Sequence, residues 1–240
     1  MRRIPTERAR EASLKLTMCG RYVSPDEASI EREFNLVRSE WTFPSSFNVA
    51  PTQSVPVIRS VDGKPQGSLM RWGLIPFFAR GVPPKYSTIN ARVETVQTAA
   101  SYRGPWGKGQ RCLQVAMGFY EWQVQTDGKT KVPFFITAND QPIFAFAALW
   151  DSSKTDSGER IESVTHITVP ANSLVGEIHN SKHRMPAILA KADRAAWLTG
   201  TPEEAWETLT SYPDDLMVAW RVSARVNAPK NNDALLIEPV

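Results

Sequence analysis

Short apolar segments of strand length, each ended by turn residues, dominate this sequence and restrict the folds open to it more than any other feature. They are rich in β-branched and aromatic residues, as is typical of β-strands. The pattern is strongest over residues 54–60, 111–122, 132–138, 142–150, 164–169 and 217–223. Such frequent strands with few helices between them predict an α+β fold whose core is an antiparallel, barrel-like sheet, and they argue against a doubly wound sheet.

A helix-start signal occurs near the N-terminus, in the sequence Ser-Pro-Asp-Glu over residues 24–27. We expect Ser24 to be the N-cap, Pro25 to occupy the first helical position and Glu27 to complete a capping box. Apolar residues at helical spacing then predict a buried stripe formed by Ile30, Phe34 and Val37.

Three further short helices are expected in the C-terminal third. The sequence Thr-Pro-Glu-Glu over residues 201–204 repeats the start signal, and Gly200 is placed to end a preceding helix that includes Trp197. Asn172 is expected to cap a helix that runs toward His179.

The bulk properties indicate a single domain. The chain has 240 residues, of which 42% are hydrophobic, and this is enough for one sizeable core. We expect one domain over residues 19–240, preceded by a polar, disordered extension over residues 1–18. The extension lacks the apolar segment of a secretory signal, and no run of about eighteen apolar residues occurs. We therefore predict a cytoplasmic protein with no membrane partner, and we expect a monomer.

The net charge of +3 does not by itself indicate a nucleic-acid partner. Residues 1–18 contain five basic and two acidic residues, so the formal charge from residue 19 onward is zero. A basic region nevertheless spans residues 71–111, where the one acid is Glu94. It contains Arg71, Arg80, Lys85, Arg92, Arg103, Lys108 and Arg111, interleaved with Trp72, Phe77, Phe78, Tyr86, Tyr102 and Trp106. This mixture is typical of a groove that binds phosphates and stacks unpaired bases, and a solvated loop region over an aromatic core is its commoner origin.

Motifs for common cofactors are absent from the sequence. It has no phosphate-binding loop, dinucleotide-binding glycine cluster or GxSxG motif, and His166, His179 and His183 have no ligand at zinc-finger spacing. We therefore predict neither a metal nor an organic cofactor. Cys19 and Cys112 are expected to be reduced thiols, with Cys112 an inert part of an apolar strand.

Asn90, Glu121 and His179 are candidates for chemistry because each lies in otherwise apolar or turn sequence. Strand alternation places Glu121 on the face opposite to Tyr120 and Trp122. A carboxylate held among aromatic residues has a raised pKa, which suits proton transfer. In isolation, a hydrogen-bonded structural glutamate is at least as good an interpretation of Glu121, and a capping or turn histidine is the favoured interpretation of His179.

Cys19 directly follows Met18, and removal of everything up to Met18 would place an α-amine and a thiol on adjacent carbons. An ordinary α-amine has a pKa of about 7.7 to 8, so roughly a tenth is neutral and nucleophilic at pH 7. A 1,2-aminothiol condenses with an aldehyde to a Schiff base and then closes through sulfur to a thiazolidine, which reverses less easily than the imine.

Taken together, these segments resemble the SOS response-associated peptidase family, whose members shield abasic sites in single-stranded DNA. The resemblance runs from Cys19 to the C-terminus through motifs in a fixed order. They are MCGRY (18–22), FNVAPTQ (47–53), MRWGLIP (70–76), INAR (89–92), GFYEW (118–122), ITVPAN (167–172), HRMPAIL (183–189) and VSARVN (222–227).

The resemblance implies that Cys19 becomes N-terminal and links covalently to the aldehyde of an abasic site. It implies that Asn90 positions the amine and the sugar, that Glu121 moves protons, and that His179 acts as acid or base near the sugar and in reversal. It implies a DNA-binding set of Arg21, Asn48, Arg71, Trp72, Arg92 and Thr168. It also implies self-processing peptidase activity and lyase-like activity, and association with the nucleoid when the protein is bound to DNA.

Alternatives stay open at this point. The residues Asn-Ser-Lys separate His179 from the HRMP motif, so His183 competes for the catalytic role, and we prefer His179 because it continues the expected helix. Either translation starts at Met18 and an aminopeptidase removes that methionine, or the protein cleaves itself between Met18 and Cys19, and we favour the first. A peptidase that acts in trans through Cys19 and His179, and a non-covalent reader of damaged or modified DNA, are the rival functions.

Overall fold

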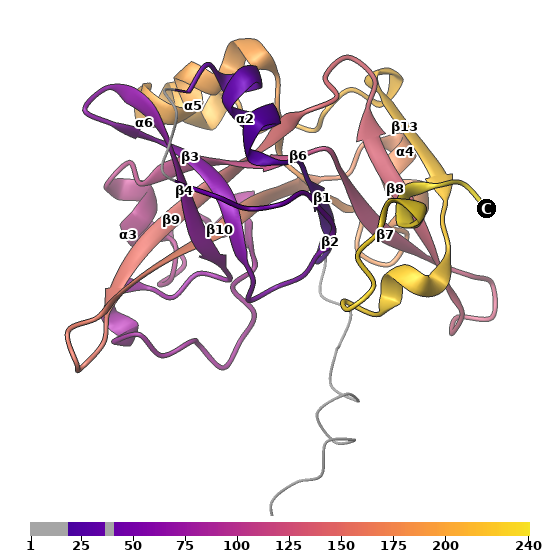
Figure 1. Cartoon of the computed structure of the whole chain (residues 1–240), viewed down its shortest axis with the longest axis horizontal. Coiled ribbons are helices and arrows are strands. Elements are labelled where there is room, and N and C mark those ends of the chain that lie inside the picture. The colour runs from indigo at the N-terminus through magenta and orange to yellow at the C-terminus, as the bar shows by residue number, and fades with distance from the viewer. Residues whose placement is uncertain (1–18, 37–40) are drawn as a thin grey trace, which may run out of the picture.

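The computed structural model describes residues 19–36 and 41–240. The expected extension over residues 1–18, and Val37 in the expected helical stripe, lie outside the described residues. Figure 1 shows two sheets side by side, with β1 and β2 at the edge of the smaller sheet that faces the larger one, and with α2, α5 and α6 together at one end of the larger sheet.

The larger sheet contains a closed ring of five strands. Each ring strand pairs with two others in the order β3, β4, β10, β9, β6 and back to β3. Their bounds are β3 Ser54–Val61, β4 Lys64–Trp72, β6 Arg111–Ala116, β9 Phe144–Lys154 and β10 Arg160–Pro170. Four of the five pairings are antiparallel and β10 with β4 is parallel, so the predicted α+β fold with a barrel-like, mainly antiparallel core is confirmed.

Three short strands extend the ring at β9 and β10. They are β5 (Asn90–Arg92), which lies parallel to β10, β11 (Arg184–Pro186), which pairs with β10, and β12 (Ile188–Leu189), which pairs with β9. The strand β10 therefore connects the segment that carries Asn90 with the segment that carries Arg184.

The second sheet is antiparallel throughout. Its order is β13 (Met217–Arg221), β8 (Lys131–Ala138), β7 (Gly118–Val124), β1 (Tyr22–Ser24) and β2 (Ser46–Val49). The pairing of Tyr22 with Phe119 places the N-terminal strand directly against β7.

The prediction of one strand over residues 111–122 is wrong, because the chain leaves the barrel at Met117 and enters the second sheet. The amide of Met117 bonds to the carbonyl of Val23 at 2.8 Å instead of continuing the ladder of β6. Gly118 permits the crossing, since a Cβ at that position would lie 2.2 Å from the ring of Phe135.

The first helix, α2 (Glu27–Phe34), begins later than predicted. Its N-cap is Asp26, whose carboxylate accepts from the Ser29 amide at 2.9 Å, and not Ser24. Ser24 belongs to β1, so its backbone is already committed to the sheet. Of the predicted stripe, Ile30 is fully buried.

The other helix signals are confirmed. Thr201 and Glu204 form the capping box of α6 (Pro202–Glu207), and α5 (Arg194–Thr199) ends at Gly200. Asn172 caps α4 (Ser173–Ile178). The remaining helical elements are α3 (Arg103–Gly107), η1 (Phe77–Ala79), η2 (Val93–Thr95), η3 (Lys191–Asp193), η4 (Asp214–Leu216), η5 (Ala224–Asn227) and η6 (Ala234–Ile237).

The buried side chains form a large cluster inside and around the barrel and a smaller one on the other face of the second sheet. Phe119 belongs to the first cluster, whereas Tyr120 and Trp122 belong to the second. The predicted alternation of side chains along β7 is therefore confirmed. Within the described residues, no helix is both long and apolar enough to span a membrane.

Candidate active site

Cys19 lies at the entrance to β1, against Glu121 of β7. The pairing of Tyr22 with Phe119 continues in antiparallel register to place Gly20 opposite Glu121. The backbone nitrogen of Cys19 donates to Oε1 of Glu121 at 2.7 Å. A contact between residues 102 positions apart thus joins the candidate nucleophile to the candidate acid or base.

Glu121 is buried, with 3% of its surface exposed. Burial raises the pKa of this carboxyl, because the charged form loses its hydration, and the neighbouring His179 and the hydrogen bonds from Cys19 oppose the rise. A carboxyl with a raised pKa pays less to hold a proton than a solvated carboxyl does, which suits a group that both accepts and donates a proton.

His179 is the C-cap of α4 and is also buried. Its Nδ1 lies 3.6 Å from Oε1 of Glu121 and 2.8 Å from the carbonyl oxygen of Arg184. Because a carbonyl oxygen only accepts hydrogen bonds, this contact assigns the proton to Nδ1. Nε2 is then the ring nitrogen available for proton exchange.

His183, the competing histidine, is exposed and has a backbone φ of +50°. Its amide donates to the carbonyl of His179 at 2.8 Å, which closes the turn that follows α4. The structure therefore brings His179, and not His183, to the buried carboxylate.

The Cys19 thiol is 2% exposed, and its pKa is raised well above the ordinary value. Desolvation is the main cause, the charge of Glu121 adds to it, and the guanidinium of Arg184 acts in the opposite direction. The thiol of the described chain is therefore protonated at neutral pH.

Asn90 is half-buried on β5, in register with His166 of β10. The hydroxyl of Tyr102 donates to its backbone carbonyl at 3.1 Å and fixes this end of the strand. Arg92, two residues further along the same strand, is exposed.

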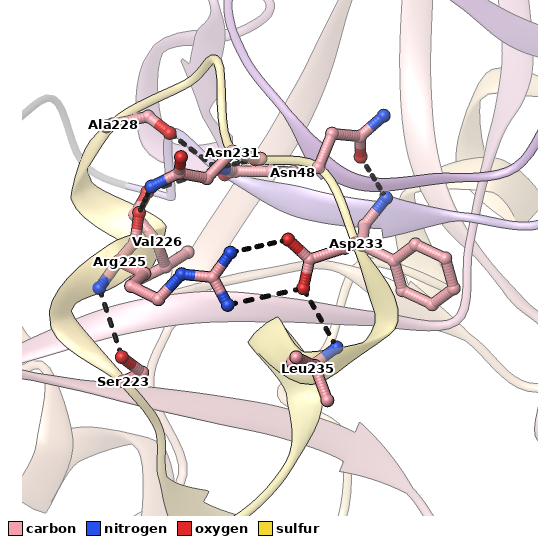
Figure 2. A network of polar contacts seen from close by, with 10 residues as sticks. Asn48, Ser223, Arg225, Val226, Ala228, Asn231, Asp233 and Leu235 are labelled. Carbon is pink, nitrogen blue, oxygen red and sulfur yellow. Dashed lines mark hydrogen bonds and ion pairs between the residues drawn. The ribbon is translucent and has the colours of Figure 1, made fainter.

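Arg21 and Asn48 of the expected DNA-binding set are buried and bonded within the protein. Nη1 of Arg21 donates to Oδ1 of Asn48 at 2.8 Å and to the carbonyl of Val226 at 2.9 Å. The amide of Asn48 donates to carbonyls of the C-terminal segment, which are those of Val226, Ala228 and Asn231. Figure 2 shows Asn48 among the residues of the C-terminal segment, where Arg225 also forms an ion pair with Asp233 at 2.7 Å. These contacts hold the C-terminal segment against the start of the domain.

Trp72 and Thr168 of the same set are fully buried as well. The Trp72 indole donates to the carbonyl of Ile89 at 3.0 Å, and the Thr168 hydroxyl donates to that of Ala91 at 3.4 Å. Arg71 is half-buried and donates to the carbonyl of Gly73, so the members that reach the surface are Arg71 and Arg92.

Arg184 is a component of the site that the motif analysis did not single out. It forms a two-point ion pair with Glu94, donates to the carbonyl of Thr168, and offers its own carbonyl to His179. Its position immediately before Met185-Pro186, in the HRMP motif, was the available signal.

Cys19, Glu121 and His179 are also residue types that ligate zinc, and one ligand atom of each lies within 4.8 Å of the others. The carboxylate and Nδ1 already bond to Cys19 and Arg184, so a metal would have to displace those contacts. The absence of a metal cofactor stays a prediction.

Comparisons with known proteins give a consistent result. Residues 18–229 match the family model described as SOS response associated peptidase (SRAP). The abasic site processing protein YoqW of Bacillus subtilis is 37% identical over 92% of this chain and 99% of the relative. The abasic site processing protein HMCES of Rattus norvegicus is 29% identical over 88% of this chain and 71% of the relative.

Two solved structures share the fold. A crystal structure of a protein from Bacteroides thetaiotaomicron has a TM-score of 0.82 at 27% identity and covers 92% of this chain and 99% of its own. A crystal structure of a protein from Bordetella bronchiseptica has a TM-score of 0.74 at 28% identity and covers 85% of this chain and 100% of its own.

Proposed function

The chain belongs to the SOS response associated peptidase (SRAP) family, and from that premise we propose that it forms a covalent thiazolidine crosslink with abasic sites in single-stranded DNA through an N-terminal Cys19. The observation that carries the proposal is the 2.7 Å hydrogen bond from the nitrogen of Cys19 to Oε1 of Glu121. That nitrogen is the atom that becomes the α-amine in the mature protein, and it already lies against a buried proton acceptor.

The chemistry begins at the ring-opened aldehyde of the abasic deoxyribose. The neutral α-amine attacks C1′ and gives a carbinolamine, which loses water to form an imine. The thiol of Cys19 then loses its proton and adds to the imine carbon, while the imine nitrogen gains a proton. Overall, one aldehyde and one aminothiol give one thiazolidine and one water.

Glu121 is the proton carrier in this sequence. As carboxylate it takes the proton of the ammonium group, and as carboxylic acid it returns that proton to the departing hydroxyl. The raised pKa of Glu121 suits both steps, because it lowers the cost of the protonated form near neutral pH.

His179 assists beside the same carboxylate oxygen, with its Nδ1 3.6 Å from Oε1 of Glu121. Its Nδ1 proton is held by the carbonyl of Arg184, so Nε2 is free to exchange a proton with the sugar hydroxyl or with the sulfur during reversal. Asn90 positions the sugar and the amine, and Arg71 and Arg92 contact phosphates of the bound strand.

Maturation must release the nitrogen of Cys19, because an acylated backbone nitrogen cannot form an imine. We favour translation from Met18 followed by aminopeptidase removal, since Cys19 is small. The described chain supports a change at this bond: Cys19 has a φ of +42°, a left-handed conformation that costs an L-residue about 1 to 2 kcal/mol. That strain disappears when the preceding peptide bond is cut. Intact mass of untagged protein tests this step, and a mature chain that retains residues 1–18 contradicts the proposal.

The decisive experiment uses chains that start at Met1 and at Met18. Each is incubated with a single-stranded oligonucleotide that carries an abasic site, and the products are separated after heating. We expect a heat-stable adduct with the Met18 form and none with Cys19→Ala. Failure of the Met18 form, or an adduct that persists in Cys19→Ala, refutes the crosslink.

The proximity of Cys19 to His179 also fits a thiol peptidase that acts in trans. Such an enzyme needs a lowered thiol pKa, however, whereas burial and Glu121 raise that of Cys19. This difference favours the aminothiol mechanism, in which the amine attacks first. Cleavage of unrelated peptides by the mature protein would favour the peptidase instead.

A further inference from the structure

The proposed maturation of Cys19 changes what the candidate active site offers to a metal ion. In the described chain, Cys19, Glu121 and His179 supply three ligand atoms within 4.8 Å of one another. They form the only group of three or more such side chains within residues 19–36 and 41–240. Once the nitrogen of Cys19 is an amine, it has a lone pair and becomes a fourth ligand atom. Four is the coordination number of zinc in most of its closed protein sites.

Two of the four ligand atoms belong to Cys19 itself. Its amine and its thiol are carried on adjacent carbons, so both can bind the same ion and close a five-membered chelate ring. After the first of the two atoms has bound, the second is already held beside the ion at a high effective concentration. The aminothiol that suits an aldehyde therefore also suits a thiophilic metal ion.

The spacing of the ligand atoms is close to that of a zinc site. Tetrahedral zinc with bonds of about 2.0 to 2.3 Å holds neighbouring ligand atoms about 3.3 to 3.8 Å apart. Nδ1 of His179 lies 3.6 Å from Oε1 of Glu121, which is within that range. The nitrogen of Cys19 is closer to the same oxygen, at 2.7 Å, because a hydrogen bond joins the two atoms. Zinc therefore has to replace this hydrogen bond and the one between Nδ1 and the carbonyl of Arg184, and it offers metal–ligand bonds in exchange.

The charge of the ligand set also matches a divalent ion. The carboxylate of Glu121 and the thiolate of Cys19 supply two negative charges, and the amine and the imidazole are neutral. A neutral complex matters here because each of the three residues is at most 5% exposed, and burial of a net charge is costly. The neighbouring Arg184 leaves this balance unchanged, since Glu94 pairs with it.

The donor atoms favour zinc over magnesium. A thiol that coordinates zinc is deprotonated by the charge of the ion, so burial of Cys19 does not prevent it from binding as a thiolate. Sulfur and nitrogen ligands suit zinc, whereas Mg²⁺ binds through oxygen atoms and water.

We propose that the mature active site binds Zn²⁺ through the amine and thiolate of Cys19, the carboxylate of Glu121 and a ring nitrogen of His179, and that the bound ion masks the aminothiol. The lone pairs that would attack the abasic aldehyde are then engaged with the metal, and Glu121 is not available to carry protons. Zinc is thus an inhibitor of the crosslink and not its cofactor. The masking rests on the proposed function, whereas zinc binding requires only that Cys19 is N-terminal.

The first test is direct metal binding by the mature chain, which intact mass shows to begin at Cys19. Titration with Co²⁺, a spectroscopic substitute for zinc, should give thiolate-to-cobalt charge transfer and tetrahedral d–d absorption at one ion per chain, and Zn²⁺ should displace the cobalt. Cys19→Ser and His179→Ala should each bind zinc about 100-fold or more weakly, because loss of an outer contact alone costs about 10- to 100-fold.

Matched controls separate this site from other thiols and histidines. Cys112→Ala removes the other free cysteine, and His183→Ala removes the exposed histidine, so both should bind zinc like wild type. A form that retains Met18 has a peptide amide at Cys19, and it should bind zinc about tenfold or more weakly because it lacks the amine ligand. Circular dichroism checks that each variant is folded.

The second test is the rate of adduct formation with a single-stranded abasic oligonucleotide. The rate should fall as free Zn²⁺ rises, with its midpoint at the zinc dissociation constant obtained from competition with cobalt, and a chelator should restore it. Mg²⁺ at the same concentrations should leave the rate unchanged. Zinc should also leave binding to undamaged single-stranded DNA unchanged, which separates masking from an effect on DNA affinity.

The two tests fail independently. Absence of bound metal, or a zinc affinity that is unchanged in Cys19→Ser, overturns the zinc site. An adduct rate that stays constant at saturating zinc overturns the masking. If the mature chain binds zinc as expected but forms no adduct in zinc-free buffer, the crosslink fails and the zinc site stands.

Discussion

The candidate catalytic cluster and the aromatic side chains of the connection between β4 and β5 differ in their exposure to solvent. Cys19, Glu121 and His179 are each at most 5% exposed. In contrast, Phe77, Phe78 and Tyr86 are each more than half exposed. Burial changes the pKa of groups that carry protons, and exposure leaves ring faces free for a ligand. From this difference we expect reactivity and affinity for DNA to be separable, so that substitutions in one region leave the function of the other intact.

The largest expected effect is on the rate of adduct formation by Glu121→Gln. Glutamine keeps the volume and the acceptor for the nitrogen of Cys19 but cannot carry a proton, so adduct formation should slow by about 100-fold or more. Binding to undamaged single-stranded DNA should stay at the wild-type level. Single-turnover kinetics on an abasic oligonucleotide check the rate, and weaker binding by this variant would show that the two regions are not separable.

The second largest expected effect is on the rate of adduct formation or reversal, and it distinguishes His179 from His183. His179→Ala should slow adduct formation or reversal by about 100-fold, because it removes the ring beside Glu121. His183→Ala is the matched control on an exposed turn and should stay within about twofold of wild type. A defect confined to His183→Ala would transfer the catalytic role to that residue.

The third expected effect is on the free energy of unfolding of Glu121→Gln and its dependence on pH. The pKa of Glu121 is raised in the fold above its ordinary value of 4.5, so the folded chain holds this proton more tightly than the unfolded chain does. The contribution of this bound proton to the free energy of unfolding is fully present below pH 4.5. It is lost as the pH rises through the pKa that Glu121 has in the folded chain. Glu121→Gln should therefore have a higher free energy of unfolding than wild type at pH 7, with the gap closing toward acid pH. Urea unfolding at several pH values measures it, and the exposed Glu207→Gln should show no such gap.

The smallest effect concerns Asn180, which follows His179. Its side chain forms two hydrogen bonds with Val124 of β7. Oδ1 of Asn180 accepts from the Val124 backbone amide at 3.1 Å, and Nδ2 donates to the Val124 carbonyl at 2.9 Å. This pair fixes the loop of His179 to the strand of Glu121. Asn180→Ala should slow adduct formation about three- to tenfold without changing DNA affinity, since one misplaced group costs modestly. Ser181→Ala is the control, and an equal loss there would indicate general loosening of the loop.

The fold was predictable where local signals were strong. Strands with β-branched and aromatic residues, the capping box at Thr201 and the Asn172 cap were all found from their patterns. The strands β1, β2 and β5, of three or four residues each, and β4, whose first half is polar and exposed, were not. Such strands exist because of the neighbours they pair with, and those neighbours are distant in sequence.

The candidate site was likewise predictable from the sequence only in part. The motifs indicated Cys19, Glu121 and His179 as candidates, and the structure brings these three together. Strand alternation correctly predicted that Glu121 lies on the face opposite to Tyr120 and Trp122. Burial could not be read from the motifs: of the residues that the resemblance placed in the DNA-binding set, Trp72 and Asn48 are enclosed and Arg92 is exposed. Phe77 and Trp72 lie in the same apolar stretch, and only the turn after β4 separates the exposed ring from the buried one.

By itself the sequence determined the family, the strand-rich fold class and the residue types able to perform aminothiol chemistry. Only the tertiary structure decided that the nitrogen of Cys19 lies 2.7 Å from Glu121, that His179 and not His183 is beside it, and which aromatic rings face water. The physical reason is register. The pairing of β1 with β7 joins segments about a hundred residues apart, and no local pattern in either segment specifies its partner.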